Sequence, residues 1–147
     1  LSLIFYLYLE MTNKKEISAA IIIIGNEVLS GRTKDLNTST LATWLNSLGI
    51  SVGEVRVIPD VEKTIIDTVH ELRAKYNYVF TTGGIGPTHD DITSESISKA
   101  FKSKYEINKE AFKILENYYG KKEFNEPRKK MAKMPKGSKL IYNPSNH

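Results

Sequence analysis

The sequence predicts a layered α/β domain with a mostly parallel sheet. Strand-like and helix-like segments alternate through the first 100 residues, which is typical of that architecture. The first of them, residues 17–24, reads ISAAIIII, a continuous β-branched run expected of a strand buried on both faces. Glycine-rich or polar loops follow each predicted strand, and no repeat or long linker interrupts residues 11–147, so we expect a single domain there.

The next segments continue this alternation. After a loop over residues 25–31, apolar residues at helical spacing predict an amphipathic helix with a face made of Leu41, Trp44, Leu45 and Leu48. Gly49 stands where a helix C-terminal glycine belongs. Residues 50–58 predict a second strand, which Pro59 and Asp60 would end.

A second helix and a third strand come next. One helical face would carry Val61, Ile65, Val69 and Leu72. Residues 76–81 predict the third strand, which leads into the glycine-rich loop of residues 82–88. A third helix should follow, with Ile97, Ala100 and Phe101 on one side.

The last third of the chain is expected to be more helical. A fourth helix is predicted over residues 108–119, closed by Gly120. Pro127 suits the first turn of a short basic helix, which Pro135 and Gly137 would end. Residues 138–142 predict a final strand.

Composition excludes several classes of protein. The 147-residue chain has no cysteine, so disulfides, thiolate metal sites and cysteine nucleophiles are excluded. Its three histidines are far apart and lack metal-ligand spacing, which argues against a histidine-rich zinc enzyme. Residues 1–10 are apolar but too short to span a bilayer and lack the pattern of a secretory signal. We therefore expect residues 1–10 to be a non-native or disordered extension ahead of a start at Met11, in a cytoplasmic protein without a membrane segment.

The net charge of +4 is unevenly distributed. Residues 102–139 hold 12 Lys and Arg residues against 5 Asp and Glu residues. The favoured interpretation is a solvated helix face. The alternative is a nucleic-acid-binding surface built from basic and aromatic side chains, namely Lys121, Lys122, Arg128, Lys129, Lys130, Lys133, Tyr118, Tyr119 and Phe124.

The loop after the third predicted strand is the best candidate for a binding site. Ligands of open α/β sheets bind beyond the carboxyl ends of the strands, where this loop should lie. Gly83, Gly84 and Gly86 permit close backbone approach, and exposed amides ahead of a helix form an anion site. Neither the dinucleotide fingerprint nor the P-loop motif fits these glycines, so the predicted phosphate site is of another type. A tight turn without a ligand is the alternative.

Carboxylates accompany the loop. Asp90 and Asp91 come directly after it, and two carboxylates beside a phosphate suggest a divalent cation such as Mg²⁺. Capping of the next helix is the alternative role for one of them. Asp60 and Glu27 follow other strands and could face the same cleft, or serve only as turn residues.

Three segments together resemble the molybdopterin-binding MoaB/Mog fold, and most closely the amino-terminal domain of CinA-like (competence/damage-inducible) proteins. They are residues 25–37, residues 57–60 and the stretch TTGGIGPTHDDIT at residues 81–93. The resemblance implies a three-layer α/β/α sandwich. It also implies catalytic roles for Asp60 and Asp91 and a metal held by Asp90 and Asp91. The ligand-binding residues that we carry over are Thr82, Gly83, Gly84, Gly86, Pro87, Thr88, Glu27 and Asn143.

The resemblance leaves several activities open. The CinA-like branch implies metal-dependent cleavage of a nucleotide pyrophosphate such as ADP-ribose, with Mg²⁺ or another divalent metal. The molybdenum-cofactor branch implies transfer of adenylate to molybdopterin. A non-catalytic, carboxy-terminally truncated remnant is the third alternative, since the family continues beyond Asn143 and Pro144 into a further ligand loop. Relatives form dimers or trimers, so a homo-oligomer that binds a pterin or an adenine nucleotide is expected.

Overall fold

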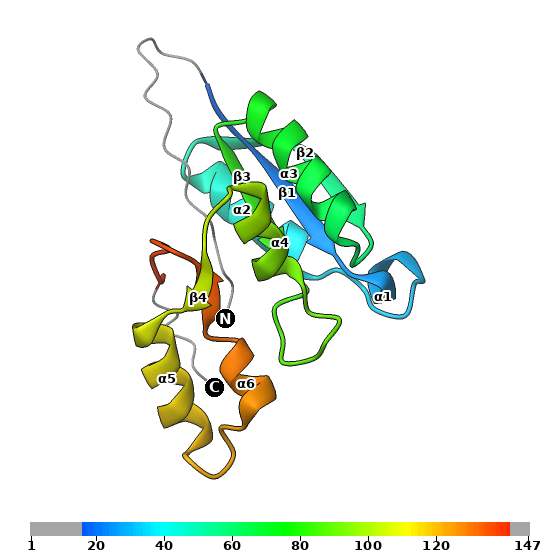
Figure 1. Ribbon diagram of the computed structural model, residues 1–147. Helices are drawn as coiled ribbons and strands as arrows, with labels where there is room; N and C mark the ends of the chain where they lie inside the picture. The colour runs from blue at the N-terminus through cyan, green and yellow to red at the C-terminus, as the bar shows by residue number, and fades with distance from the viewer. Residues whose placement is uncertain (1–15, 142–147) are drawn as a thin grey trace.

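A three-stranded parallel sheet forms the centre of the protein (Figure 1). The computed structural model describes residues 16–141. Strand β1 (Ile17–Ile24) lies between β2 (Ile50–Ile58) and β3 (Tyr78–Thr82), and both pairings are parallel. Six consecutive residues of β1, Ala19 to Ile24, are buried, as the uninterrupted apolar run predicts. The predicted parallel sheet is confirmed.

Helices cover both faces of this sheet. On one face, α3 (Glu62–Lys75) and α4 (Thr93–Ala100) pack against Ile22 and Ile24. On the other face, α2 (Asn37–Ser47) packs against Ile21 and Ile23. Alternate residues of β1 thus serve two separate cores, and the predicted three-layer α/β/α arrangement is confirmed.

Replacing a central isoleucine should destabilise the protein strongly. Ile22 of β1 is completely buried beneath α3 and α4. Ile22→Ala should therefore lower the free energy of unfolding by about 2–5 kcal/mol. Ile17, on the same strand, is 45% exposed, and Ile17→Ala should cost about 1 kcal/mol or less. Urea unfolding of both variants checks this, and equal losses would contradict the assignment of β1 to the core.

A second, smaller unit follows α4. Strands β4 (Tyr105–Ile107) and β5 (Lys133–Pro135) form an antiparallel pair. Helices α5 (Lys109–Tyr119) and α6 (Glu126–Lys130) lie between them in the chain. The unit has its own buried cluster, made of Ala111, Leu115, Phe124, Ala132 and Met134. Figure 1 shows it below the three-layer part, on the side where α4 and the loop before it lie.

The structure corrects several predicted elements. Residues 26–29 form a short helix, α1 (Asn26–Leu29), where only a loop was expected. The prediction of a final strand is wrong over residues 138–141, which form no strand. The basic helix ends at Lys130, earlier than Pro135, because β5 begins at Lys133. Trp44 and Leu48, expected on the apolar face of α2, are each more than half exposed, since β2 is an edge strand that offers them little cover. Predictions about residues 1–10, Met11, Tyr142 and Asn143 lie outside the described residues. Within residues 16–141, no helix has the length and apolarity to cross a membrane.

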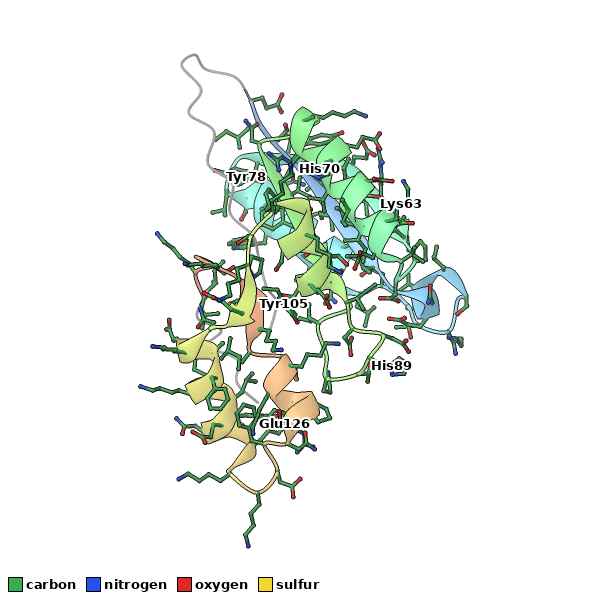
Figure 2. The ribbon with its side chains drawn as sticks, in the orientation of Figure 1. Lys63, His70, Tyr78, His89, Tyr105 and Glu126 are labelled. Carbon is green, nitrogen blue, oxygen red and sulfur yellow. The ribbon has the colours of Figure 1, made fainter. Side chains whose placement is uncertain are left out.

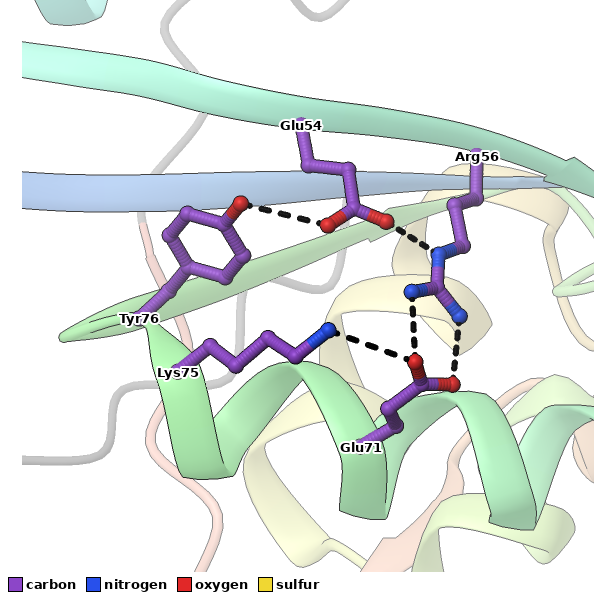
Figure 3. Close-up of polar contacts among 5 residues, drawn as sticks. All are labelled: Glu54, Arg56, Glu71, Lys75 and Tyr76. Carbon is purple, nitrogen blue, oxygen red and sulfur yellow. Dashed lines mark hydrogen bonds and ion pairs between the residues drawn. The ribbon is translucent and has the colours of Figure 1, made fainter.

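An ion-pair network ties the edge strand β2 to α3 (Figure 3). The Arg56 guanidinium donates to both oxygens of Glu71, at 2.6 and 2.8 Å, and also to Glu54. Lys75 donates to Glu71 at 3.4 Å, and the Tyr76 hydroxyl donates to Glu54 at 3.2 Å. The hydrogen bonds from Arg56 lower the pKa of Glu71 to about 2.

This network should make stability depend on pH in the acid range. Because the pKa of Glu71 falls from 4.5 to about 2 on folding, its contribution is complete above pH 4.5 and is lost as the pH falls toward 2. The thermal midpoint of the wild type should exceed that of Glu71→Gln at pH 7, and the gap should shrink between pH 4.5 and pH 2. Glu116→Gln is the control, since within the described residues its carboxylate forms no ion pair. A gap that stays constant with pH would contradict this role of Glu71.

Candidate functional site

The loops that follow β1, β2 and β3 meet at one edge of the sheet. The amide of Gly25, after β1, donates to the carbonyl of Ile58, at the end of β2, at 3.0 Å. The Asp60 carboxylate accepts from the amide of Asn26 at 3.0 Å. Asp60 therefore joins the loop after β2 to the start of α1. This agrees with its predicted place at the carboxyl edge of the sheet.

Two adjacent glycines shape the loop after β3. Gly83 has φ +89° and Gly84 has φ +62°, the left-handed region that favours glycine. A Cβ atom on Gly83 would overlap the carbonyl oxygen of Ile24, and one on Gly84 would overlap the hydroxyl of Thr93. The same Cβ on Gly84 would lie 3.2 Å from a carboxylate oxygen of Asp60. The main chain of this loop thus passes directly over β1 and beside Asp60, where only glycine fits.

Thr93 holds the loop to the start of α4. Its hydroxyl donates to the carbonyl of Gly83 and its amide to the carbonyl of Gly84, each at 3.0 Å. Both carbonyls are therefore turned toward α4. Among the hydrogen bonds of the described residues, the amides of Gly84 and Ile85 donate to no protein group. Unpaired amides at such a turn are the donors that an anion site requires.

Asp91 closes the end of the same loop. Its carboxylate accepts from the amide of Thr88 at 2.8 Å and from the Thr88 hydroxyl at 2.7 Å. Partial burial alone would raise the pKa of Asp91, but the hydrogen bonds from Thr88 and Gly86 and the charge of Lys130 together lower it. Asp91 is therefore ionised at neutral pH. In the structure, its carboxylate fixes the conformation of the loop through Thr88.

The side chain of Asp90 does not contact Thr88 as that of Asp91 does. Its carboxylate pairs with His89 at 3.1 Å, and both side chains are largely exposed. Figure 2 shows His89 on the outer side of the loop. Within residues 16–141, no three His, Asp or Glu side chains gather as a metal site would require. Asp90 and Asp91 thus do not fit a metal cage built by the protein alone, and a metal bound by them stays a prediction.

A hollow lies between the loop and the smaller unit. The hollow is small and open to solvent. The residues that line it are Gly84, Ile85, Gly86, Asp91 and Ser94 from the loop and α4, and Tyr105, Leu115, Lys130, Met131 and Lys133 from the smaller unit. Figure 2 shows Tyr105 where the smaller unit adjoins the three-layer part. Burial, with a smaller effect of Glu95, raises the pKa of Tyr105, so its hydroxyl stays neutral. The hollow joins apolar and aromatic surface to positive charge.

The structure gathers some of the predicted site residues and leaves others apart. Gly84, Gly86 and Asp91 line the hollow, whereas Glu27 is exposed and turns its carboxylate toward Gly25. Thr82 ends β3 and pairs with β1, while Pro87 and Thr88 complete the turn. Thr93 and Tyr105 were missed. Thr93 had a usable signal, a hydroxyl at a helix start just after a glycine loop, but Tyr105 had none.

All three basic residues of α6 contact other groups of the protein. Arg128 donates to Glu123 and stacks 4.4 Å from the ring of Tyr119, and Lys129 pairs with Glu126 at 2.6 Å. Lys130 donates to main-chain carbonyls of the loop. These contacts favour the solvated-face interpretation over a nucleic-acid surface.

Comparisons with known proteins agree with this fold. The profile of a family described as "probable molybdopterin binding domain" matches residues 20–146. A protein from Pyrobaculum calidifontis is 42% identical over 129 residues, covering 86% of this chain and 49% of its own length. A protein from Sulfurisphaera tokodaii is 43% identical over 128 residues, covering 85% of this chain and 49% of its own length. The chain spans about half the length of the curated relatives it matches.

Solved structures show the same architecture. The structure of CinA from Thermoplasma acidophilum, described as a protein with unknown function, superposes with a TM-score of 0.80 at 31% identity, covering 87% of this chain and 76% of that one. The structure of the tungsten cofactor synthesizing protein MoaB from Pyrococcus furiosus gives a TM-score of 0.54 at 23% identity, covering 81% and 69%. The second likeness concerns the fold alone.

Proposed function

The chain belongs to the molybdopterin-binding domain family, and we propose that it binds a small phosphorylated ligand, a pterin or an adenine nucleotide, at the loop of residues 82–91. The observation that carries this proposal is the pair of amides at Gly84 and Ile85. Both residues line the hollow, and within the described contacts neither amide has a protein acceptor. Backbone amides at a glycine turn ahead of a helix recognise phosphate.

The ring system of such a ligand would lie against the rest of the hollow, with its outer face in solvent. Tyr105, Leu115 and Met131 offer aromatic and apolar surface, and Lys130 and Lys133 add positive charge. Small-molecule sites commonly combine apolar walls with a few fixed polar groups. A molecule with a phosphate at one end and a flat heterocycle at the other matches this distribution.

The proposal extends to the reaction that the bound ligand undergoes. We propose cleavage of a nucleotide pyrophosphate such as ADP-ribose, with adenylyl transfer to molybdopterin as the alternative, because residues 25–37, 57–60 and 81–93 resemble those of CinA-like proteins. Asp60 and Asp91, the two proposed catalytic carboxylates, stand on different sides of the loop: Asp60 beside Gly84 and Asp91 at Thr88. Mg²⁺ or another divalent cation would have to be held largely by ligand phosphates, a common arrangement for Mg²⁺. A non-catalytic binding domain is the competing proposal.

Ligand-dependent stabilisation tests the binding proposal. The full chain is titrated in a thermal-shift assay with AMP, ATP, ADP-ribose and a pterin monophosphate, with and without Mg²⁺. A ligand that binds only the native state raises the melting temperature by mass action. A rise with at least one phosphorylated ligand is expected, and none with any of them would contradict the proposal. Turnover of ADP-ribose with Mg²⁺ or Co²⁺ then separates hydrolysis from binding alone.

Assembly and location complete the proposal. We propose a homo-oligomer, a dimer or trimer, in the cytoplasm. Exposed apolar side chains on the α2 side of the sheet, including Trp44, Val55 and Val57, support self-association. Light scattering after size-exclusion chromatography would give the mass, and a monomer at micromolar concentration would contradict the proposed assembly.

A further inference from the structure

Lys130 links the smaller unit to the glycine-rich loop. It is the last residue of α6, about forty positions after the loop, yet its ammonium reaches two loop carbonyls. The Lys130 Nζ donates to the carbonyl of Thr88 at 2.7 Å and to the carbonyl of Asp91 at 2.8 Å. The carboxylate of Asp91 already links the same two residues, because it accepts hydrogen bonds from Thr88. The Lys130 ammonium thus bridges the two ends of the four-residue turn from Thr88 to Asp91.

The ammonium also belongs to the wall of the hollow. Lys130 lines it together with Gly84, Ile85 and Gly86. A lysine ammonium has three donors, and within the described contacts two of them are used by Thr88 and Asp91. One N–H of the ammonium therefore has no acceptor among the described contacts. Gly84 and Ile85, whose amides have no protein acceptor among the described contacts, line the same hollow.

We propose that Lys130 binds the phosphate group of the ligand and at the same time positions the turn of residues 88–91. The proposal rests on the proposed function, because it assumes that the hollow takes a phosphorylated molecule. Phosphate would receive donors from two sides: the amides of the loop and the ammonium of α6. A charged donor of this kind forms a strong hydrogen bond with an oxyanion. The smaller unit would then form one wall of the binding site.

Lys129 provides a matched control. It precedes Lys130 on α6 and carries the same charge, but it pairs with Glu126 at 2.6 Å and does not line the hollow. Lys129→Met and Lys130→Met remove the same charge from the same helix. A general effect of net charge would therefore appear in both variants.

The test compares ligands with and without phosphate. Equilibrium dialysis measures the affinity of the full chain for two pairs: AMP with adenosine, and a pterin monophosphate with the same pterin lacking phosphate. Lys130→Met should weaken binding of the phosphorylated member by about tenfold or more and that of its partner by less than about twofold. Lys130→Arg should restore most of the lost affinity, and Lys129→Met should change neither by more than about twofold.

The outcomes separate this inference from the proposed function. If wild-type protein binds a phosphorylated probe but Lys130→Met weakens both members of a pair equally, Lys130 only supports the structure and the inference is wrong. Unchanged binding in that variant would also overturn it. If the wild type binds no probe, the proposed function fails as well. Lys130→Gln, which keeps a donor for the loop carbonyls without the charge, should show the same selective loss if Lys130→Met does not fold.

Discussion

Gly83→Ala is expected to disrupt both folding stability and ligand binding. The residue has φ +89°, and a Cβ atom there would overlap the carbonyl oxygen of Ile24, which belongs to the central strand and cannot move aside easily. A left-handed conformation costs a residue with a Cβ roughly 1–2 kcal/mol, and overpacking adds about 1–3 kcal/mol. The free energy of unfolding should therefore fall by about 2–5 kcal/mol, as urea unfolding would measure.

Gly49→Ala separates backbone strain from overlap. Gly49 has φ +77°, but nothing lies within 4 Å of the position of its Cβ. This variant should lose only about 1–2 kcal/mol, the cost of the left-handed conformation, and should bind ligand as the wild type does. Equal losses in the two variants would mean that the loop does not pass closely over β1 at Gly83.

Asp91→Ala should weaken ligand binding strongly while the fold persists. The carboxylate of Asp91 accepts two hydrogen bonds from Thr88, and without them the turn that faces the hollow would no longer be fixed. Each hydrogen bond to a charged group contributes about 1.5–3 kcal/mol, so the affinity should fall by about tenfold or more. Isothermal titration calorimetry with the ligand that stabilises the wild type would measure the loss.

The neighbouring carboxylate is the control for this experiment. Asp90 is exposed and pairs with His89, so Asp90→Ala should leave affinity within about twofold of the wild type. If both variants abolish binding in the presence of Mg²⁺ and neither does so in its absence, the two carboxylates act together on a metal. If neither variant changes binding, the role of Asp91 is wrong.

The three-layer part of the fold was predictable because its signals are local. The short, β-branched apolar run of β1 indicates a strand buried on both faces, and the helical spacing around Ile65, Val69 and Leu72 marks one face of α3. The glycine loop was predictable for a similar reason, since Gly83 and Gly84 stand between a strand and a helix. Only tertiary packing shows that Ile24 and Thr93 leave no room for side chains there.

The smaller unit was not predictable in detail. Strands β4 and β5 have three residues each, too few for a period to be recognised, and β5 ends in Pro135. Their pairing brings together segments that the whole of α5 and α6 separates. For the same reason the contact of Lys130 with the loop has no local signal. The sequence shows a basic helix, and only the packing of the two units distinguishes Lys130 from Lys129.

Mapping of ligand-induced shifts in amide resonances tests the central claim most directly. Isotope-labelled full chain is titrated with AMP and with a pterin monophosphate, and the amide signals are followed by nuclear magnetic resonance. The proposed site predicts the largest shifts at Gly84, Ile85, Gly86 and Thr88, with smaller ones around Lys130. Binding that shifts residues elsewhere, such as the exposed face of α2 around Trp44, and leaves the loop of residues 82–91 unchanged would contradict the proposed site.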